Sequence, residues 1–243
     1  MSRLRRVFRV VPRDHAEPPH ALRRRRQVVA ATALGGAGLL GASLSAQPGS
    51  ARFYQFTAAT AATWAGGSVL SGRLHLGRSF GRGDRLERPV LVPVALGVAA
   101  FVPFYAGALV CRRVGPLRRM LTSVLNYAHQ GSSGAVLATT LVNGAAEEVF
   151  FRGALYAAVP PGNPVATSAA AYALATTATR NPVLVAASAV MGVLWGVQRR
   201  SSGGIQASMI THLVWSSLML RFLPPLFPPR VDESMDSAAD WHA

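Results

Sequence analysis

The feature that most constrains the fold is a succession of long apolar stretches separated by short, arginine-rich segments. Half of the residues are hydrophobic, and the mean hydropathy is positive. An apolar stretch of about 20 residues is long enough to cross the hydrocarbon core of a bilayer as a helix. The sequence therefore predicts an all-α protein, a polytopic transmembrane helix bundle of about seven spans.

The predicted spans are bounded by charged or turn-forming residues. In chain order they cover 28–45, 53–71, 89–111, 135–159, 165–179, 182–198 and 205–220. The sequence after the first span resembles a signal-peptide cleavage site, so this helix is either cleaved or retained. The long polar region that precedes it favours an uncleaved helix.

The chain divides into three regions by composition. Residues 1–27 are predicted to be a disordered, basic cytoplasmic tail, and residues 28–223 the transmembrane bundle. Residues 224–243 are rich in proline and then acidic, and are predicted to be a disordered tail. No internal repeat is visible.

The net charge of +15 would suggest a nucleic-acid partner in a soluble protein. Here the arginines lie between apolar stretches, where they determine topology and contact lipid headgroups, so we expect the lipid bilayer as partner and no nucleic acid. The positive-inside rule places the N-terminus and loop 73–88 in the cytoplasm. The arginines of 112–130 break this rule. Either that segment is an interfacial amphipathic helix, which would make eight helices, or the span count is off by one.

Ionisable residues inside the predicted spans are the best indicators of function. Glu147 and Glu148 lie in an apolar span, where one carboxylate costs roughly 2.5–3.5 kcal/mol on insertion scales. On a helix Glu148 and Arg152 are i,i+4 neighbours and can pair, whereas Glu147 lies above Asn143 on the adjacent strip. One carboxylate is thus neutralised, and the other is left available for chemistry.

A histidine on the last span is the second polar feature. His212 and Ser216 are one turn apart and lie on the same face of a helix. The structural alternative is a buried histidine that is hydrogen-bonded to a neighbouring helix. The corresponding alternative for Glu148 and Arg152 is an ion pair that only ties helices together.

Together the residues read Glu-Glu-x-x-x-Arg on one helix and His-x-x-x-Ser on a later one. This pattern resembles the CAAX proteases and bacteriocin-processing enzymes, the CPBP or Abi family of intramembrane proteases, which includes the Rce1-type prenyl protease. The resemblance covers about residues 89–220. Between its two outer motifs that family has Phe-x-x-x-His, and here Trp195 and Arg199 occupy those positions.

The resemblance implies hydrolysis of a peptide bond in a membrane-associated peptide or protein, lipidated in some members of the family, at a bacterial plasma membrane. Glu147 would act as general base toward a water molecule, and Glu148 with Arg152 would orient it. His212, helped by Ser216, would donate a hydrogen bond to the oxyanion.

Arg199 changes the chemistry that the family pattern implies. A guanidinium stays protonated, so it neither ligates a metal nor accepts a proton. A zinc site with two histidines and a carboxylate therefore cannot be assembled from the motif residues, and we expect no metal and no cofactor. Arg199 and Asn143 remain candidates for contact with the substrate or the oxyanion.

Two other functions are compatible with these residues. A protein that keeps the fold but has lost turnover, because Arg199 replaces the second histidine, would act as a membrane scaffold or regulator. A transporter could use the carboxylates to bind protons or cations, but no pair of broken helices indicates one.

Overall fold

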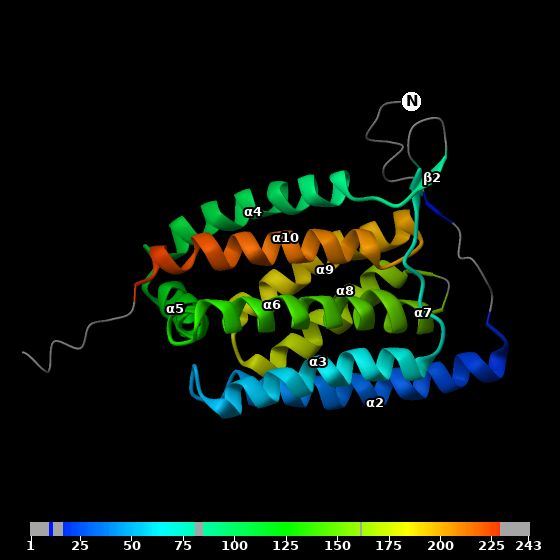
Figure 1. Ribbon diagram of the computed structural model, residues 1–243, viewed down its shortest axis with the longest axis horizontal. Coiled ribbons are helices and arrows are strands. Elements are labelled where there is room, and N and C mark those ends of the chain that lie inside the picture. Colours follow the sequence, from blue (N-terminus) through cyan, green and yellow to red (C-terminus); the bar gives the residue numbers. More distant parts are fainter. Residues whose placement is uncertain (1–9, 12–16, 81–84, 161, 229–243) are drawn as a thin grey trace, which may run out of the picture.

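The computed structural model describes residues 10–11, 17–80, 85–160 and 162–228 as a bundle of helices (Figure 1). The α-helices are α2 (Pro19–Ser43), α3 (Ala51–Ser71), α4 (Leu91–Cys111), α5 (Gly115–His129), α6 (Ser133–Glu147), α7 (Tyr156–Ala158), α8 (Pro164–Thr176), α9 (Pro182–Ser202) and α10 (Gln206–Phe222). The π-helix η2 (Glu148–Leu155) joins α6 to α7, and the 3₁₀-helices η3 (Thr177–Thr179) and η4 (Pro224–Leu226) follow α8 and α10. The prediction of a helical bundle is confirmed.

The helices associate in pairs around α6. Helix α2 packs on α3, α8 on α9, and α4 on α10, while α6 contacts both α3 and α10 (Figure 1). The only strands in the described part of the chain are β1 (Ser79–Phe80) and β2 (Leu86–Glu87), which pair antiparallel. They belong to the connection between α3 and α4, at the right-hand end of the bundle in Figure 1.

Several helices begin where the sequence supplies a capping residue. The Ser132 hydroxyl accepts the backbone N–H of Ala135 at the start of α6. Asn163 and Asn181 cap α8 and α9 in the same way, and a proline follows each of them at the first helical position. Such side chains satisfy backbone N–H groups that have no partner within the helix. Capping residues in the sequence therefore help to set where α6, α8 and α9 start.

Three predicted boundaries were wrong. Helix α2 begins at Pro19, inside the predicted tail 1–27, because Arg25 is buried and hydrogen-bonded to Glu17, to Ser71 and to the carbonyl oxygen of Arg73. Residues 1–9 and 12–16 of that tail lie outside the described residues.

Helix α9 continues past the predicted end of its span at residue 198 and stops at Ser202, where Gly203 takes a left-handed conformation with φ 67°. At the other terminus, η4 and the buried Phe227 lie in the segment predicted as a disordered tail. The rest of that tail, 229–243, is outside the described residues.

The segment 112–130 forms a helix of its own, α5, at one end of the bundle. The Tyr127 hydroxyl donates to the carbonyl oxygens of Leu44 and Ala46, both at 2.8 Å, so α5 packs against the α2–α3 connection. The opposite end holds the loop after α3, where Ile205 N–H donates to the His75 carbonyl oxygen at 3.0 Å. The α5 arginines are thus at the end of the bundle away from the N-terminal arginines. The predicted span 89–111, which leads away from loop 73–88, requires this position. The segment is a helix separate from α4.

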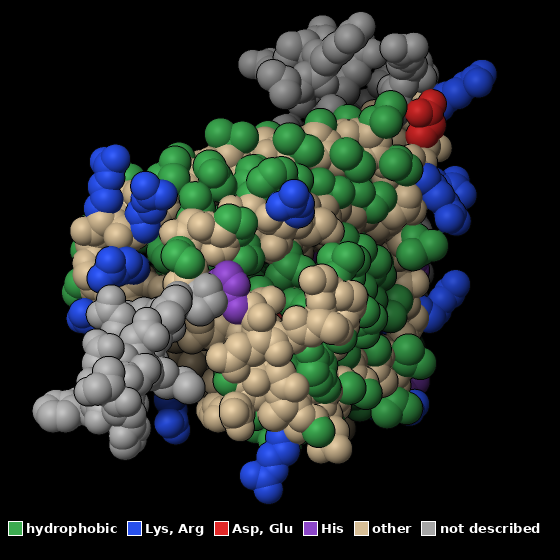
Figure 2. All heavy atoms as spheres, turned by 60° about the vertical axis from the view of Figure 1, so that its left-hand side comes forward, with side chains coloured by type: hydrophobic (Ala, Val, Ile, Leu, Met, Phe, Trp, Pro, Cys, Tyr) green, Lys and Arg blue, Asp and Glu red, His purple; other side chains and the backbone are tan. Residues whose placement is uncertain are grey.

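The outer surface of the bundle is largely apolar. Many large hydrophobic side chains of α4 are exposed, including Leu91, Val102 and Val110. In Figure 2 apolar side chains cover much of the upper part and the right of the visible face, and most of the arginines lie toward its left and right edges. Among the described helices, α4 and α9 are long and apolar enough to cross a membrane. The count of seven spans stays a prediction.

Candidate active site

The two glutamates lie where the winding of the helix changes. Glu147 is the last residue of α6, and Glu148 is the first residue of the π-helix η2. Phe150 and Phe151 hold this segment in the core by packing on Trp64 of α3, with ring centroids 4.6 and 5.1 Å away. π-helical turns are rare and occur frequently at functional sites. The sequence predicts one continuous α-helix here, and its apolar periodicity contains no signal for the wider winding.

Glu148 is completely buried and lies between Arg152 and His212. Its Oε1 atom is 3.2 Å from Nη1 of Arg152 and 3.1 Å from Nδ1 of His212. The ion pair predicted between Glu148 and Arg152 is therefore present, and His212 joins it from α10. Because a buried carboxylate is costly unless it is paired, these two contacts keep Glu148 ionised.

Arg152 is also completely buried and connects three elements. Its Nη2 atom donates to the carbonyl oxygen of Gly192 in α9 at 3.3 Å. The guanidinium carbon lies 4.8 Å from the ring centroid of Tyr172 in α8 and 5.0 Å from that of Trp195 in α9. Such cation–π contacts stabilise a charge that has been removed from water. Arg152 thus fixes Glu148 relative to the α8–α9 pair.

Glu147 differs from Glu148 in both exposure and partners. It is only partly buried, and its Oε2 atom accepts a hydrogen bond from the Tyr172 hydroxyl at 2.7 Å. Within the described residues its carboxylate has no other hydrogen bond, so most of its acceptor capacity is unused. The sequence reasoning missed Tyr172, which lies in an alanine-rich helix whose sequence gives no indication of a polar contact.

His212 is held with one ring edge on Glu148 and the other toward α6. Its ring stacks on Trp195, with centroids 3.8 Å apart and planes at 19°. Because Glu148 is ionised and can only accept, Nδ1 carries the hydrogen, and Nε2 is the opposite nitrogen. A Cβ atom placed on Gly144 would be 3.5 Å from Nε2. Gly144 and Glu147 are i,i+3 neighbours on α6, so Nε2 and the Glu147 carboxylate are on the same face.

The match to a protein family agrees with this arrangement. Residues 130–218 match the family described as "Type II CAAX prenyl endopeptidase Rce1-like". This segment is therefore similar to the Rce1-like family. The family is membrane-embedded, and the apolar helices α4 and α9 fit that environment. The match supports, in general terms, a membrane endopeptidase acting on a peptide or protein.

The match is somewhat shorter than the resemblance predicted from the motifs, which began at residue 89, and it contains all the motif residues. Comparison with the curated proteins and with the solved structures gave no match.

Arg199, which stands where the second family motif has a histidine, hydrogen-bonds to the protein backbone in this structure. Arg199 is buried, and its Nε atom donates to the carbonyl oxygen of Arg152 at 2.6 Å. Its guanidinium also lies over the ring of Tyr156, 5.0 Å from the centroid. These contacts support the π-helix that presents Glu148. The residue of α9 that reaches His212 is Trp195, one turn earlier.

Two other predicted site residues, Asn143 and Ser216, make no hydrogen bond to Glu147 or His212 within the described part of the chain. The Asn143 amide donates to the carbonyl oxygen of Thr139 in its own helix at 3.0 Å. Ser216 is buried one turn beyond His212 on α10. Their predicted roles toward substrate or oxyanion stay predictions.

Metal ligands are scarce around the site. In the described ranges no three histidine, cysteine, aspartate or glutamate residues lie close enough together to hold a metal ion. The residues present therefore do not fit a zinc centre built from two histidines and a carboxylate. That the reaction needs no metal stays a prediction.

Proposed function

We propose that this chain is an intramembrane, CAAX-protease-like endopeptidase that hydrolyses a peptide bond of a membrane-associated peptide or protein with water activated by Glu147. The observation that supports this most directly is the unequal use of the two adjacent carboxylates. Glu148 is buried between Arg152 and His212, whereas Glu147 is partly exposed and has one hydrogen bond. A general base needs an accessible acceptor that is not already committed to a cation.

The proposed reaction starts with the substrate carbonyl on the α6 face, beside Nε2 of His212. Glu147 accepts a proton from water while the water oxygen attacks the carbonyl carbon, and the carbonyl oxygen becomes an oxyanion. His212, protonated on both nitrogens, donates from Nε2 to that oxyanion. Glu147 then passes its proton to the leaving amine as the C–N bond breaks. Glu148 and Arg152 stay in their ion pair throughout.

Three contacts support this geometry before any substrate binds. The Glu148 carboxylate holds the His212 ring through Nδ1, and Trp195 restricts the orientation of that ring by stacking on it. The Tyr172 hydroxyl fixes the direction of the Glu147 carboxylate. Pre-positioned groups of this kind lower the cost of reorganisation in the transition state.

A second candidate function is favoured by Arg199. Because the family places a histidine there and a guanidinium cannot accept a proton, the chain could be a catalytically degenerate scaffold or regulator with the same fold. The buried contact from Arg199 to the Arg152 carbonyl oxygen would then be a structural replacement for a lost catalytic group.

The experiment that separates the two functions is cleavage of a membrane-peptide library. The full chain is reconstituted in liposomes, and products are identified by mass spectrometry, with and without a metal chelator. We expect new peptide termini that persist with the chelator. Products that disappear with the chelator contradict the metal-free mechanism, and no products under any condition would favour the scaffold.

Arg199→His tests the second motif. If the position is a degenerate catalytic site, the imidazole should create cleavage where there was none, or measurable Zn²⁺ binding. If the site works without this histidine, the variant should gain neither. It should then cleave more slowly, because the hydrogen bond to the Arg152 carbonyl oxygen is lost. Cleavage rate and Zn²⁺ binding by calorimetry are the measurements.

Tyr172→Phe should lower the cleavage rate by roughly 10-fold, because the 2.7 Å hydrogen bond to Glu147 contributes about 1.5–3 kcal/mol when its acceptor is charged. The aromatic contacts of the ring with Arg152 and Phe151 are retained, so the loss of stability should not exceed that of the one hydrogen bond, about 1.5–3 kcal/mol. The control is Tyr105→Phe, which makes the same chemical change on a tyrosine of α4 that lies outside the site. An unchanged rate in Tyr172→Phe would show that Tyr172 does not position the base.

A further inference from the structure

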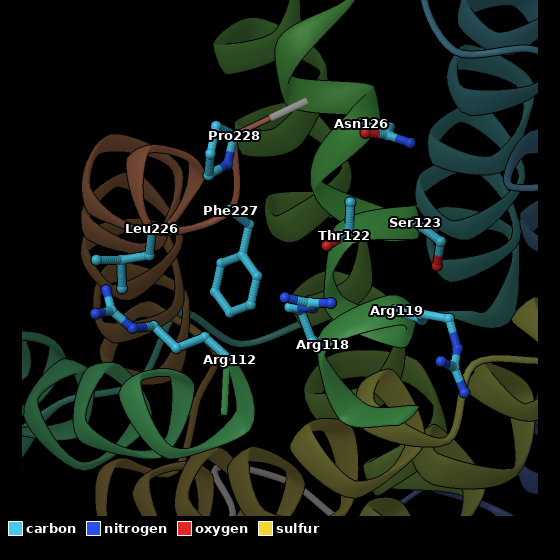
Figure 3. Close-up of a pocket in the computed structure, with 9 residues that line it drawn as sticks. All are labelled: Arg112, Arg118, Arg119, Thr122, Ser123, Asn126, Leu226, Phe227 and Pro228. Carbon is cyan, nitrogen blue, oxygen red and sulfur yellow. The ribbon is translucent and has the colours of Figure 1, made fainter. Parts of the chain in front are cut away.

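A basic pocket lies at the α5 end of the bundle, away from the glutamates at the far end of α6. Arg112 follows α4, while Arg118, Arg119, Thr122 and Asn126 come from α5, and the segment after α10 closes the other side (Figure 3). The cavity has a volume of about 480 Å³. This is in the range of ligand pockets, roughly 300–1,000 Å³.

The pocket is held in shape by the segment that follows α10. Phe227 is buried against Leu125 of α5 and Ala108 of α4. The ring Nε2 of His129 lies 3.0 Å from the Phe227 carbonyl oxygen, which ties the segment to the end of α5. Figure 3 shows the Phe227 ring between the arginine-bearing segments. The pocket is therefore part of the packed structure and not a gap between separate helices.

Its lining is suited to an anion. Arg112, Arg118 and Arg119 are exposed, and none of the residues lining the pocket is acidic. Within the described residues, no ion pair to these three guanidinium groups is present. Thr122 and Asn126 add neutral hydrogen-bond donors. Guanidinium groups match phosphate oxygens in geometry and charge.

The surroundings favour a lipid as the source of that anion. Helix α5 is amphipathic, with Leu121 and Leu125 packed toward the bundle and Arg118 and Arg119 outward. It crosses the end of a bundle whose flank is the exposed apolar surface of α4. Basic pockets between transmembrane helices, close to the level of the lipid headgroups, bind anionic phospholipids.

We propose that this pocket binds the phosphate group of an anionic membrane lipid. The acyl chains would then lie along the apolar surface of α4, and the phosphate would be held by Arg112, Arg118 and Arg119. This site does not depend on the proposed hydrolase activity, because neither Glu147 nor His212 lines the pocket.

The test titrates the detergent-solubilised full chain with a fluorescent, short-chain phosphatidylglycerol, with phosphatidylcholine as the neutral comparison. We expect the triple variant R112Q/R118Q/R119Q to weaken phosphatidylglycerol binding by at least 10-fold, since each arginine near a membrane surface contributes about 1 kcal/mol, or roughly 5-fold. The matched control R78Q/R85Q/R88Q removes three exposed arginines at the other end of the bundle and should leave binding within 2-fold.

Three outcomes would overturn the proposal. Equal weakening in both triple variants would mean that binding reflects overall charge. Displacement of the lipid by an equal concentration of glycerol phosphate would mean that the site takes free phosphate. Residues 229–243 carry four carboxylates, Asp232, Glu233, Asp236 and Asp240. If only the variant D232N/E233Q/D236N/D240N binds lipid, those carboxylates occupy the pocket instead.

Discussion

Glu147→Gln is expected to lower the rate of peptide cleavage by about 10²–10⁴-fold, the contribution typical of a general base. The amide keeps the size of the side chain and an oxygen that can accept from the Tyr172 hydroxyl, so the local packing should be preserved. It cannot take a proton from water. The measurement is the rate of product formation from a cleaved library peptide in liposomes, with the thermal midpoint followed in parallel.

The matched control for this variant is Glu87→Gln, which makes the same chemical change on an exposed residue of β2. It should leave the rate unchanged. If Glu147→Gln cleaves at the rate of the unmodified chain, another residue is the base, and the proposed division of labour between the two glutamates is wrong.

Arg152→Met should reduce the free energy of unfolding by about 3–5 kcal/mol, the usual cost of removing one partner from a buried ion pair. The substitution leaves Glu148 completely buried with His212 as its remaining side-chain partner. It also removes the hydrogen bond to the Gly192 carbonyl oxygen and the cation–π contact with Trp195. The measurement is the thermal midpoint of unfolding in detergent.

Two further variants show whether the loss comes from the orphaned charge. Glu148→Gln/Arg152→Met removes both charges and should recover part of the stability, because a neutral amide is cheaper to bury than an unpaired carboxylate. Arg200→Met makes the same chemical change on an exposed arginine of α9, and it should change the thermal midpoint little. Equal midpoints for Arg152→Met and Arg200→Met would contradict a stabilising ion pair.

Much of the fold could be predicted from the sequence because apolar runs, prolines and capping residues are local signals. The start of α9 at Pro182 and the ion pair between Glu148 and Arg152 follow from such signals. The ordered stretch from Pro19 was missed because its stability comes from distant partners of Arg25, among them Ser71. A run of arginines alone is typical of a solvated tail.

The candidate site was predictable only in part, for the same reason. Motif spacing identified Glu147 and His212, but their partners are set by packing between helices. The contact of Tyr172 with Glu147 and the stacking of Trp195 on His212 join residues of different helices. Likewise the sequence pattern assigned His212 to the oxyanion and did not predict its hydrogen bond to Glu148. Only the tertiary arrangement determines which of the two carboxylates forms a hydrogen bond with the imidazole ring of His212.

The π-helix has a consequence for protein engineering. Because η2 closes its hydrogen bonds from i to i+5, each hydrogen-bonded loop encloses one more residue than in the α-helix before it. Transplanting the Glu-Glu-x-x-x-Arg spacing onto an ideal α-helix of a designed bundle would therefore keep the residue spacing but change the angular position of Arg152 relative to Glu148 around the helix axis. A designer who wants this chemistry must copy the change in winding, together with an Arg199-like donor for the Arg152 carbonyl oxygen.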